Sequence, residues 1–85
     1  MSSLITFHIY RTELLTLKGE KFTVTFTKRS DQEEYALFAI NATGSKSWRA
    51  FYSSEIANDF KQSTGRALED EVYEVLKSDI ERGEV

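Results

Sequence analysis

The turn at residues 43–47 has residue types that could bind a phosphate group. Gly44, Ser45, Lys46 and Ser47 supply a glycine, a lysine and hydroxyl groups in sequence, the components of a phosphate-binding loop. Such a loop needs a second glycine and leads into a helix whose N-terminus faces the anion. Here there is one glycine, and the run that follows, WRAFY, is typical of a strand. We therefore interpret the segment as a reverse turn with Lys46 in solvent, and expect no cofactor.

Basic and aromatic residues are interleaved around this turn, as they are in sheets that bind single-stranded nucleic acids. The residues that would form such a surface are Lys28, Arg29, Lys46, Trp48 and Arg49. Strand alternation weakens this interpretation, because it places Trp48 and Arg49 on opposite faces. Weak single-stranded nucleic-acid binding therefore stands as the alternative function.

Residues for catalysis are scarce. The chain has a single histidine, His8, and no cysteine. Ser45 and Ser47 lack the second glycine of a nucleophile elbow, and the carboxylates of the C-terminal part follow the pattern of a solvated helix face. Neither an EF-hand loop nor an H-E-x-x-H pattern occurs. We expect a non-enzymatic protein with no catalytic residues and no metal site.

Length and composition indicate one folded domain spanning residues 1–85. The chain is 40% hydrophobic and 13% aromatic, which disordered chains are not. The net charge of −3 is unevenly spread: residues 1–52 hold seven Lys or Arg against five Asp or Glu, and residues 53–85 hold four against nine. The absence of cysteine and of a long apolar run leads us to expect a cytoplasmic protein without a membrane segment.

Apolar and polar residues alternate with period two before Tyr52, which predicts strands. Phe22, Val24 and Phe26 are expected to face the core, with the intervening threonines in solvent. In the first strand the same alternation assigns Ile5, Phe7 and Ile9 to the core and His8 to the solvated face. Gly19-Glu20 predicts a two-residue hairpin of type II′, which pairs residues 14–18 with residues 20–28.

After Tyr52 the period lengthens to that of helices. Ser53 or Ser54 is suited to be an N-cap, Glu55 follows in the first turn, and Gly65 is suited to end the helix. A second apolar stripe begins after Arg66 and ends near Gly83. The stripe contains Leu68, Val72, Val75, Leu76 and Ile80.

The order of these elements predicts an α+β fold, ββββαα, with about four antiparallel strands in residues 1–52 and two helices in residues 53–85 packed on one sheet face. The other face is then left uncovered. The third predicted strand is apolar on both sides, so either Tyr35 and Leu37 with Ala39, or Ala36 and Phe38 with Ile40, must point outward together with Phe51. Contiguous exposed apolar surface indicates an interface. The alternative is that the second helix or the N-terminal segment wraps over this row and covers it.

An acidic helix is the second candidate surface, because its carboxylates could dock on a basic partner and Tyr73 could anchor the contact. From these patterns we predict a small protein-binding or regulatory module whose partner is another protein or a second copy of the chain, most simply in a two-fold homodimer. The candidate partner-binding residues are Tyr35, Leu37, Phe38, Phe51, Glu69, Asp70, Glu71, Tyr73 and Glu74.

Overall fold

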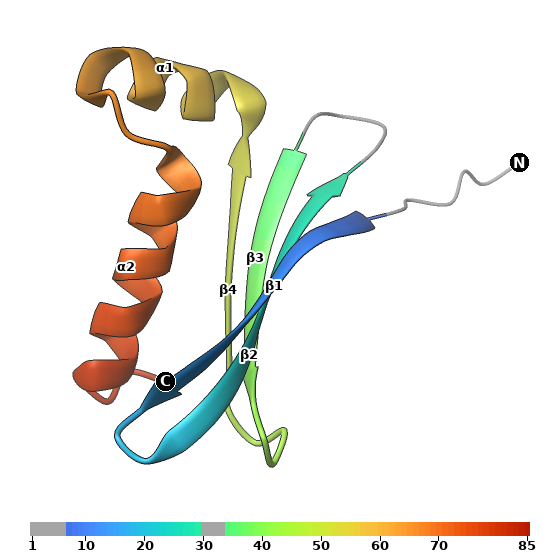
Figure 1. Cartoon of the computed structure of the whole chain (residues 1–85), viewed down its shortest axis with the longest axis vertical. Helices are drawn as coiled ribbons and strands as arrows, with labels where there is room; N and C mark the ends of the chain where they lie inside the picture. Colours follow the sequence, from blue (N-terminus) through green and yellow to red (C-terminus); the bar gives the residue numbers. More distant parts are fainter. Residues whose placement is uncertain (1–6, 30–33) are drawn as a thin grey trace, which may run out of the picture.

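A computed structural model describes residues 7–29 and 34–85 and confirms the α+β class. Figure 1 shows one open antiparallel sheet followed by two helices. The strands, in sheet order, are β1 (Phe7–Leu17), β2 (Glu20–Arg29), β3 (Glu34–Asn41) and β4 (Ser47–Ser53), and the helices are α1 (Ser54–Thr64) and α2 (Leu68–Glu81). Because each strand pairs with the next one along the chain, the sheet is a simple meander. No helix in the described part of the chain is long and apolar enough to cross a membrane.

The hairpin between β1 and β2 turns one residue earlier than the sequence predicted. Leu17 pairs with Glu20, so the loop residues are Lys18 and Gly19. Both have positive φ angles, 54° and 77°, which makes this a type I′ turn in place of type II′. The type I′ backbone matches the twist of the strands. The resulting stabilisation of the hairpin outweighs the conformational energy cost of placing Lys18 in the left-handed region.

We expect Lys18→Asn to raise the free energy of unfolding by about 0.5–1 kcal/mol, since asparagine adopts the left-handed conformation with less strain than lysine. Urea unfolding of the two proteins measures the difference. Lys18→Ala is the control, because it removes the same side chain but keeps an unfavourable residue in the turn. Equal stability of the two variants would contradict this explanation.

The core lies between the sheet and α2. Phe22, Val24 and Phe26 of β2 are at most 1% exposed, as the alternation of that strand predicted. They pack with Leu76 and Ile80 of α2, which lie four residues apart on one face of the helix. Trp48 of β4 packs against the same cluster, and its indole Nε1–H donates a 2.8 Å hydrogen bond to Oδ2 of Asp79. This contact joins the edge strand to α2.

A β-bulge changes the direction of the side chains in β1. The register shifts between Ile9 and Arg11, so that Tyr10 has no direct partner in β2. His8 pairs with Lys28 on the face that α2 covers, and Ile9 pairs with Thr27 on the opposite face, where it is 64% exposed. The predicted facing of Ile9 and His8 is therefore wrong, because the bulge reverses the alternation of β1: Arg11, Glu13 and Leu15 pair with the core-facing residues of β2, whereas Ile9 does not. Ile5 lies outside the described residues.

The two helices contribute unequally to the core. α1 starts with Ser53 as N-cap, whose Oγ accepts a 3.2 Å hydrogen bond from the Ile56 N–H, and it ends at Gly65, as predicted. It has no buried residue, and Ile56 is 57% exposed. Figure 1 shows the reason: α1 continues from the end of β4 past the edge of the sheet, and α2 alone returns along it. Only α2 therefore covers the sheet face.

Candidate functional site

The sheet face opposite α2 carries large apolar side chains that no described element covers. We call this surface the open face and define it by five residues. Ile9 is 64% exposed, Leu14 is 83% exposed, Ile40 is 50% exposed and Phe51 is 53% exposed. The fifth residue, Phe38, is partly buried. Phe38 and Phe51 meet edge to face with ring centroids 5.8 Å apart.

The open face contains some of the predicted partner-binding residues and excludes others. Alternation in β3 places Phe38 on it, beside Phe51 of β4. Tyr35 and Leu37 lie on the covered face, and Leu37 is only 1% exposed within the core. Leu37 was therefore a wrong choice for a binding surface, since its side chain is already used to hold α2.

Basic residues surround the apolar side chains of the open face. Register places Lys21, Arg29 and Arg49 on this side of the sheet. Arg29 lies 3.7 Å from Glu34 in an ion pair, whereas Lys21 and Arg49 are exposed to solvent. The open face thus combines an apolar centre with positive charge.

The four acidic residues of α2 that were predicted to bind a partner are each paired with a basic residue of the same chain. Glu71 binds Arg66 at 2.9 Å, and Glu74 binds Lys77 at 2.7 Å. Glu69 and Asp70 lie 3.5 and 3.7 Å from Arg11. Since these intramolecular partners offset the charge that a basic partner would recognise, the helix offers a weaker docking surface than its sequence indicated.

Tyr73 is partly buried and packs against the core. Its ring meets Phe26 edge to face at 5.8 Å, and the Lys77 ammonium lies 4.9 Å from its centroid. Burial raises the pKa of its hydroxyl. The predicted anchoring role is thus replaced by a packing role between α2 and the sheet.

The five residues of the predicted nucleic-acid surface do not come together. Trp48 points into the core, and Arg49 lies on the open face. Lys46 binds Glu20 at 2.8 Å beside the turns that join β1 to β2 and β3 to β4. Lys28 lies on the covered face and Arg29 on the other. A strand of nucleic acid would have to contact both sides of the sheet to reach them all.

A second site, which the sequence did not indicate, lies where the sheet meets the α1–α2 connection. We call it the tyrosine cleft. It has a volume of about 650 Å³, and its principal lining residues are Tyr10, Lys28, Tyr35, Tyr52, Lys61 and Glu69. Tyr35 and Tyr52 are cross-strand partners whose rings stack 5.4 Å apart, and Tyr10 meets Tyr35 edge to face at 6.3 Å. The bulge in β1 turns Tyr10 toward this group.

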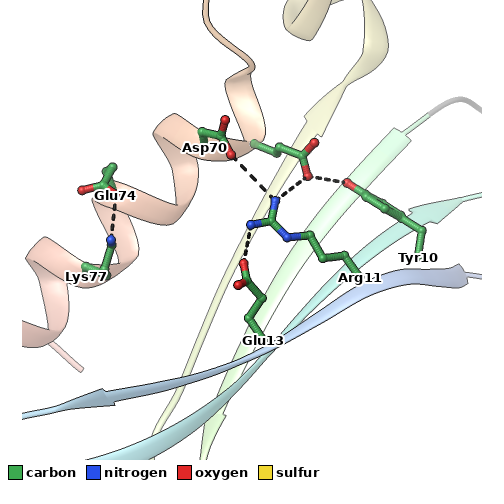
Figure 2. Close-up of polar contacts among 7 residues, drawn as sticks. Tyr10, Arg11, Glu13, Asp70, Glu74 and Lys77 are labelled. Carbon is green, nitrogen blue, oxygen red and sulfur yellow. Dashed lines mark hydrogen bonds and ion pairs between the residues drawn. The ribbon is translucent and has the colours of Figure 1, made fainter.

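Arg11 fixes one wall of the cleft by linking β1 to the first turn of α2. Its guanidinium lies 4.4 Å from the Phe26 ring centroid and contacts Glu13, Glu69 and Asp70, as Figure 2 shows in part. The Tyr10 hydroxyl donates a 3.3 Å hydrogen bond to the same Glu69 oxygen that Arg11 contacts. The Glu69 carboxylate is thereby held against the sheet and partly neutralised.

Two tyrosine hydroxyls of the cleft, those of Tyr10 and Tyr52, are held in their neutral form. Burial, followed by the negative charge of Glu69, raises the pKa of Tyr52 to about 12. Burial also raises the pKa of Tyr10, with further contributions from Tyr52 and Glu69. Both hydroxyls therefore remain hydrogen-bond donors across the physiological pH range.

Comparison with known proteins leaves these sites to be interpreted from their geometry. No family model, no curated protein and no solved structure matches this chain.

Proposed function

We propose that this protein is a small non-enzymatic binding module that associates through the open face, with a second copy of the chain as its partner. The observation that carries the proposal is the set of large apolar side chains on a sheet face that no described element covers, four of which are at least half exposed. Apolar surface of this extent favours association, because burying it removes it from water.

The size of the open face fits a weak dimer. Four strands spaced about 4.8 Å apart, each at least seven residues long at about 3.3 Å per residue, cover roughly 440 Å². Two such faces give a flat area of roughly 900 Å², and side-chain relief adds to it. Stable complexes start near 1,200 Å² of buried surface, so we expect a dissociation constant in the micromolar range or weaker.

The residues at the centre of the open face suit contact with a second copy. Two sheets packed face to face about 10 Å apart form the ordinary sandwich arrangement. A two-fold axis would bring the paired rings of Phe38 and Phe51 opposite the same rings of the other copy. Arg49, the cross-strand neighbour of Phe38, has a planar guanidinium that stacks on aromatic rings. Arg49 therefore has stacking partners at such an interface.

Sedimentation equilibrium over a concentration series tests the proposal. We expect the unmodified protein to dimerise and Phe51→Glu to remain monomeric. Two-fold symmetry would introduce the buried carboxylate twice, so the affinity should fall by at least about 100-fold. Ile56→Glu is the matched control, since Ile56 has a similar exposed fraction but lies on α1, and it should dimerise normally.

Circular dichroism establishes that both variants are folded. A protein that stays monomeric at millimolar concentration, or a dimer that persists in Phe51→Glu, would contradict the proposal.

A further inference from the structure

The tyrosine cleft has the dimensions of a small-molecule site and takes no part in the association proposed above. Its volume of about 650 Å³ falls within the range of roughly 300–1,000 Å³ typical of ligand sites. One wall is the sheet, and the other consists of α1, the connection after it and the start of α2. Apolar atoms of Ala57, Ala67 and Leu68 complete the lining on the helical side.

Aromatic rings dominate the sheet wall of the cleft. Tyr35 and Tyr52 support each other in a stack, and Tyr10, with 48% of its surface exposed, offers the most accessible ring of the three. A tyrosine ring fixed by neighbouring rings is a good platform for a flat ligand, because stacking on it costs little side-chain freedom. The cleft therefore favours a ligand that contains a planar ring.

The charge of the cleft is positive although the chain as a whole is negative. Lys28 on the sheet and Lys61 on α1 supply two positive charges against the one carboxylate of Glu69. The Lys28 ammonium lies 5.6 Å from the Tyr35 ring centroid, and neither lysine has an ion-pair partner among residues 7–29 and 34–85. Glu69 is itself paired with Arg11. These lysines can therefore receive an anionic group beside the rings.

Two polar groups of the cleft can bind the edge of such a ring. Glu69 uses Oε2 for Tyr10 and Arg11, and Oε1 accepts no hydrogen bond from the described residues. The amide of Asn58, on α1, offers both a donor and an acceptor. Carboxylate and amide groups recognise exocyclic amines and ring nitrogens of nucleobases.

We propose that the tyrosine cleft binds a nucleotide, whose base stacks on Tyr10 and whose phosphate lies between Lys28 and Lys61. The ligand supplies the flat ring, the N–H donors and the negative charge that the cleft is arranged to contact. A nucleotide occurs both as a free mononucleotide and at the end of a nucleic-acid single strand. The affinities of the protein for these two ligands distinguish the two sources.

Isothermal titration calorimetry with AMP, adenosine, inorganic phosphate and a short oligodeoxyadenylate tests this inference. We expect saturable binding of AMP, with adenosine and phosphate each weaker by about tenfold or more, because each lacks one of the two interactions. A strand that binds much more tightly than AMP, with a steep salt dependence, would identify single-stranded nucleic acid as the source. Equal affinities would identify the free nucleotide.

Variants of the cleft separate this binding from nonspecific attraction. Lys61→Ala should weaken AMP binding about three- to tenfold and leave adenosine binding unchanged. Tyr10→Ala should weaken both ligands about tenfold or more. Lys21→Ala, an exposed lysine on the open face, is the control and should have no effect. Should Tyr10→Ala fail to fold, Lys61→Ala carries the test, because Lys61 is exposed on α1.

Two results would overturn the inference. One is the absence of saturable binding for both AMP and the oligonucleotide. The other is binding that Lys61→Ala leaves unchanged.

Discussion

Leu76→Ala is expected to lower the free energy of unfolding by about 2–5 kcal/mol, the range for leucine deletions in protein cores. Leu76 is fully buried, and with Ile80 it supplies the buried surface through which α2 holds the sheet. An 85-residue domain has a total stability of roughly 4–13 kcal/mol, so the loss is a large part of the whole. Urea unfolding followed by circular dichroism measures it.

Val75→Ala provides the matched control for this substitution. Val75 is the preceding residue of the same helix, but it is 45% exposed. Its truncation should change the free energy of unfolding by less than about 1 kcal/mol, since little apolar contact is lost and alanine favours the helix. Similar losses from both variants would contradict the conclusion that the buried contacts of Leu76 are what holds α2 on the sheet.

Alkaline pH is expected to destabilise the protein through the tyrosines whose pKa values are raised in the folded state. An unfolded tyrosine releases its proton near pH 10, whereas Tyr52 in the folded protein has its pKa raised to about 12. Below pH 10 the hydroxyl is protonated in both states, and its contribution to stability is fully present. Between about pH 10 and pH 12 the unfolded state alone ionises, so stability falls as pH rises. Tyr10 and Tyr73, whose pKa values are also raised, act in the same direction.

Urea midpoints measured from pH 8 to pH 12 test this expectation, with Tyr52→Phe as the comparison. The variant lacks the ionisable hydroxyl but keeps the ring that stacks on Tyr35. Its midpoint should fall less steeply above pH 10 than that of the unmodified protein. Identical slopes would show that the Tyr52 hydroxyl is ionised as easily in the folded state as in the unfolded state.

The sequence predicted the element order well because its local patterns are strong. The alternation of Phe22, Val24 and Phe26 with threonines identifies the core side of β2, and Ser53 and Gly65 mark the two ends of α1. The stacking of Tyr35 on Tyr52 could also have been inferred. A hairpin centred on Thr43 and Gly44 places these two residues opposite each other.

Other features depend on contacts that the sequence does not encode locally. The bulge at Tyr10 shifts the register of β1, and the exposed position of Ile56 follows from where β4 ends relative to the sheet. Pairing of Glu69 with Arg11 requires α2 to return along the sheet. For the same reason, the composition of the tyrosine cleft could not be predicted, since it combines residues from all four strands and both helices.

The meander order of the sheet has a consequence for how the chain folds. Every strand pairs with its neighbour in sequence, so the sheet assembles through short loop closures, which carry a small entropic cost and favour fast folding. The contacts of Leu76 and Ile80 with β2 and β3 close a much longer stretch of chain and need the sheet as their template. Until α2 docks, both faces of the sheet are apolar and accessible to other molecules. The docking of this one helix is therefore the step that decides which face becomes the core and which is left for association.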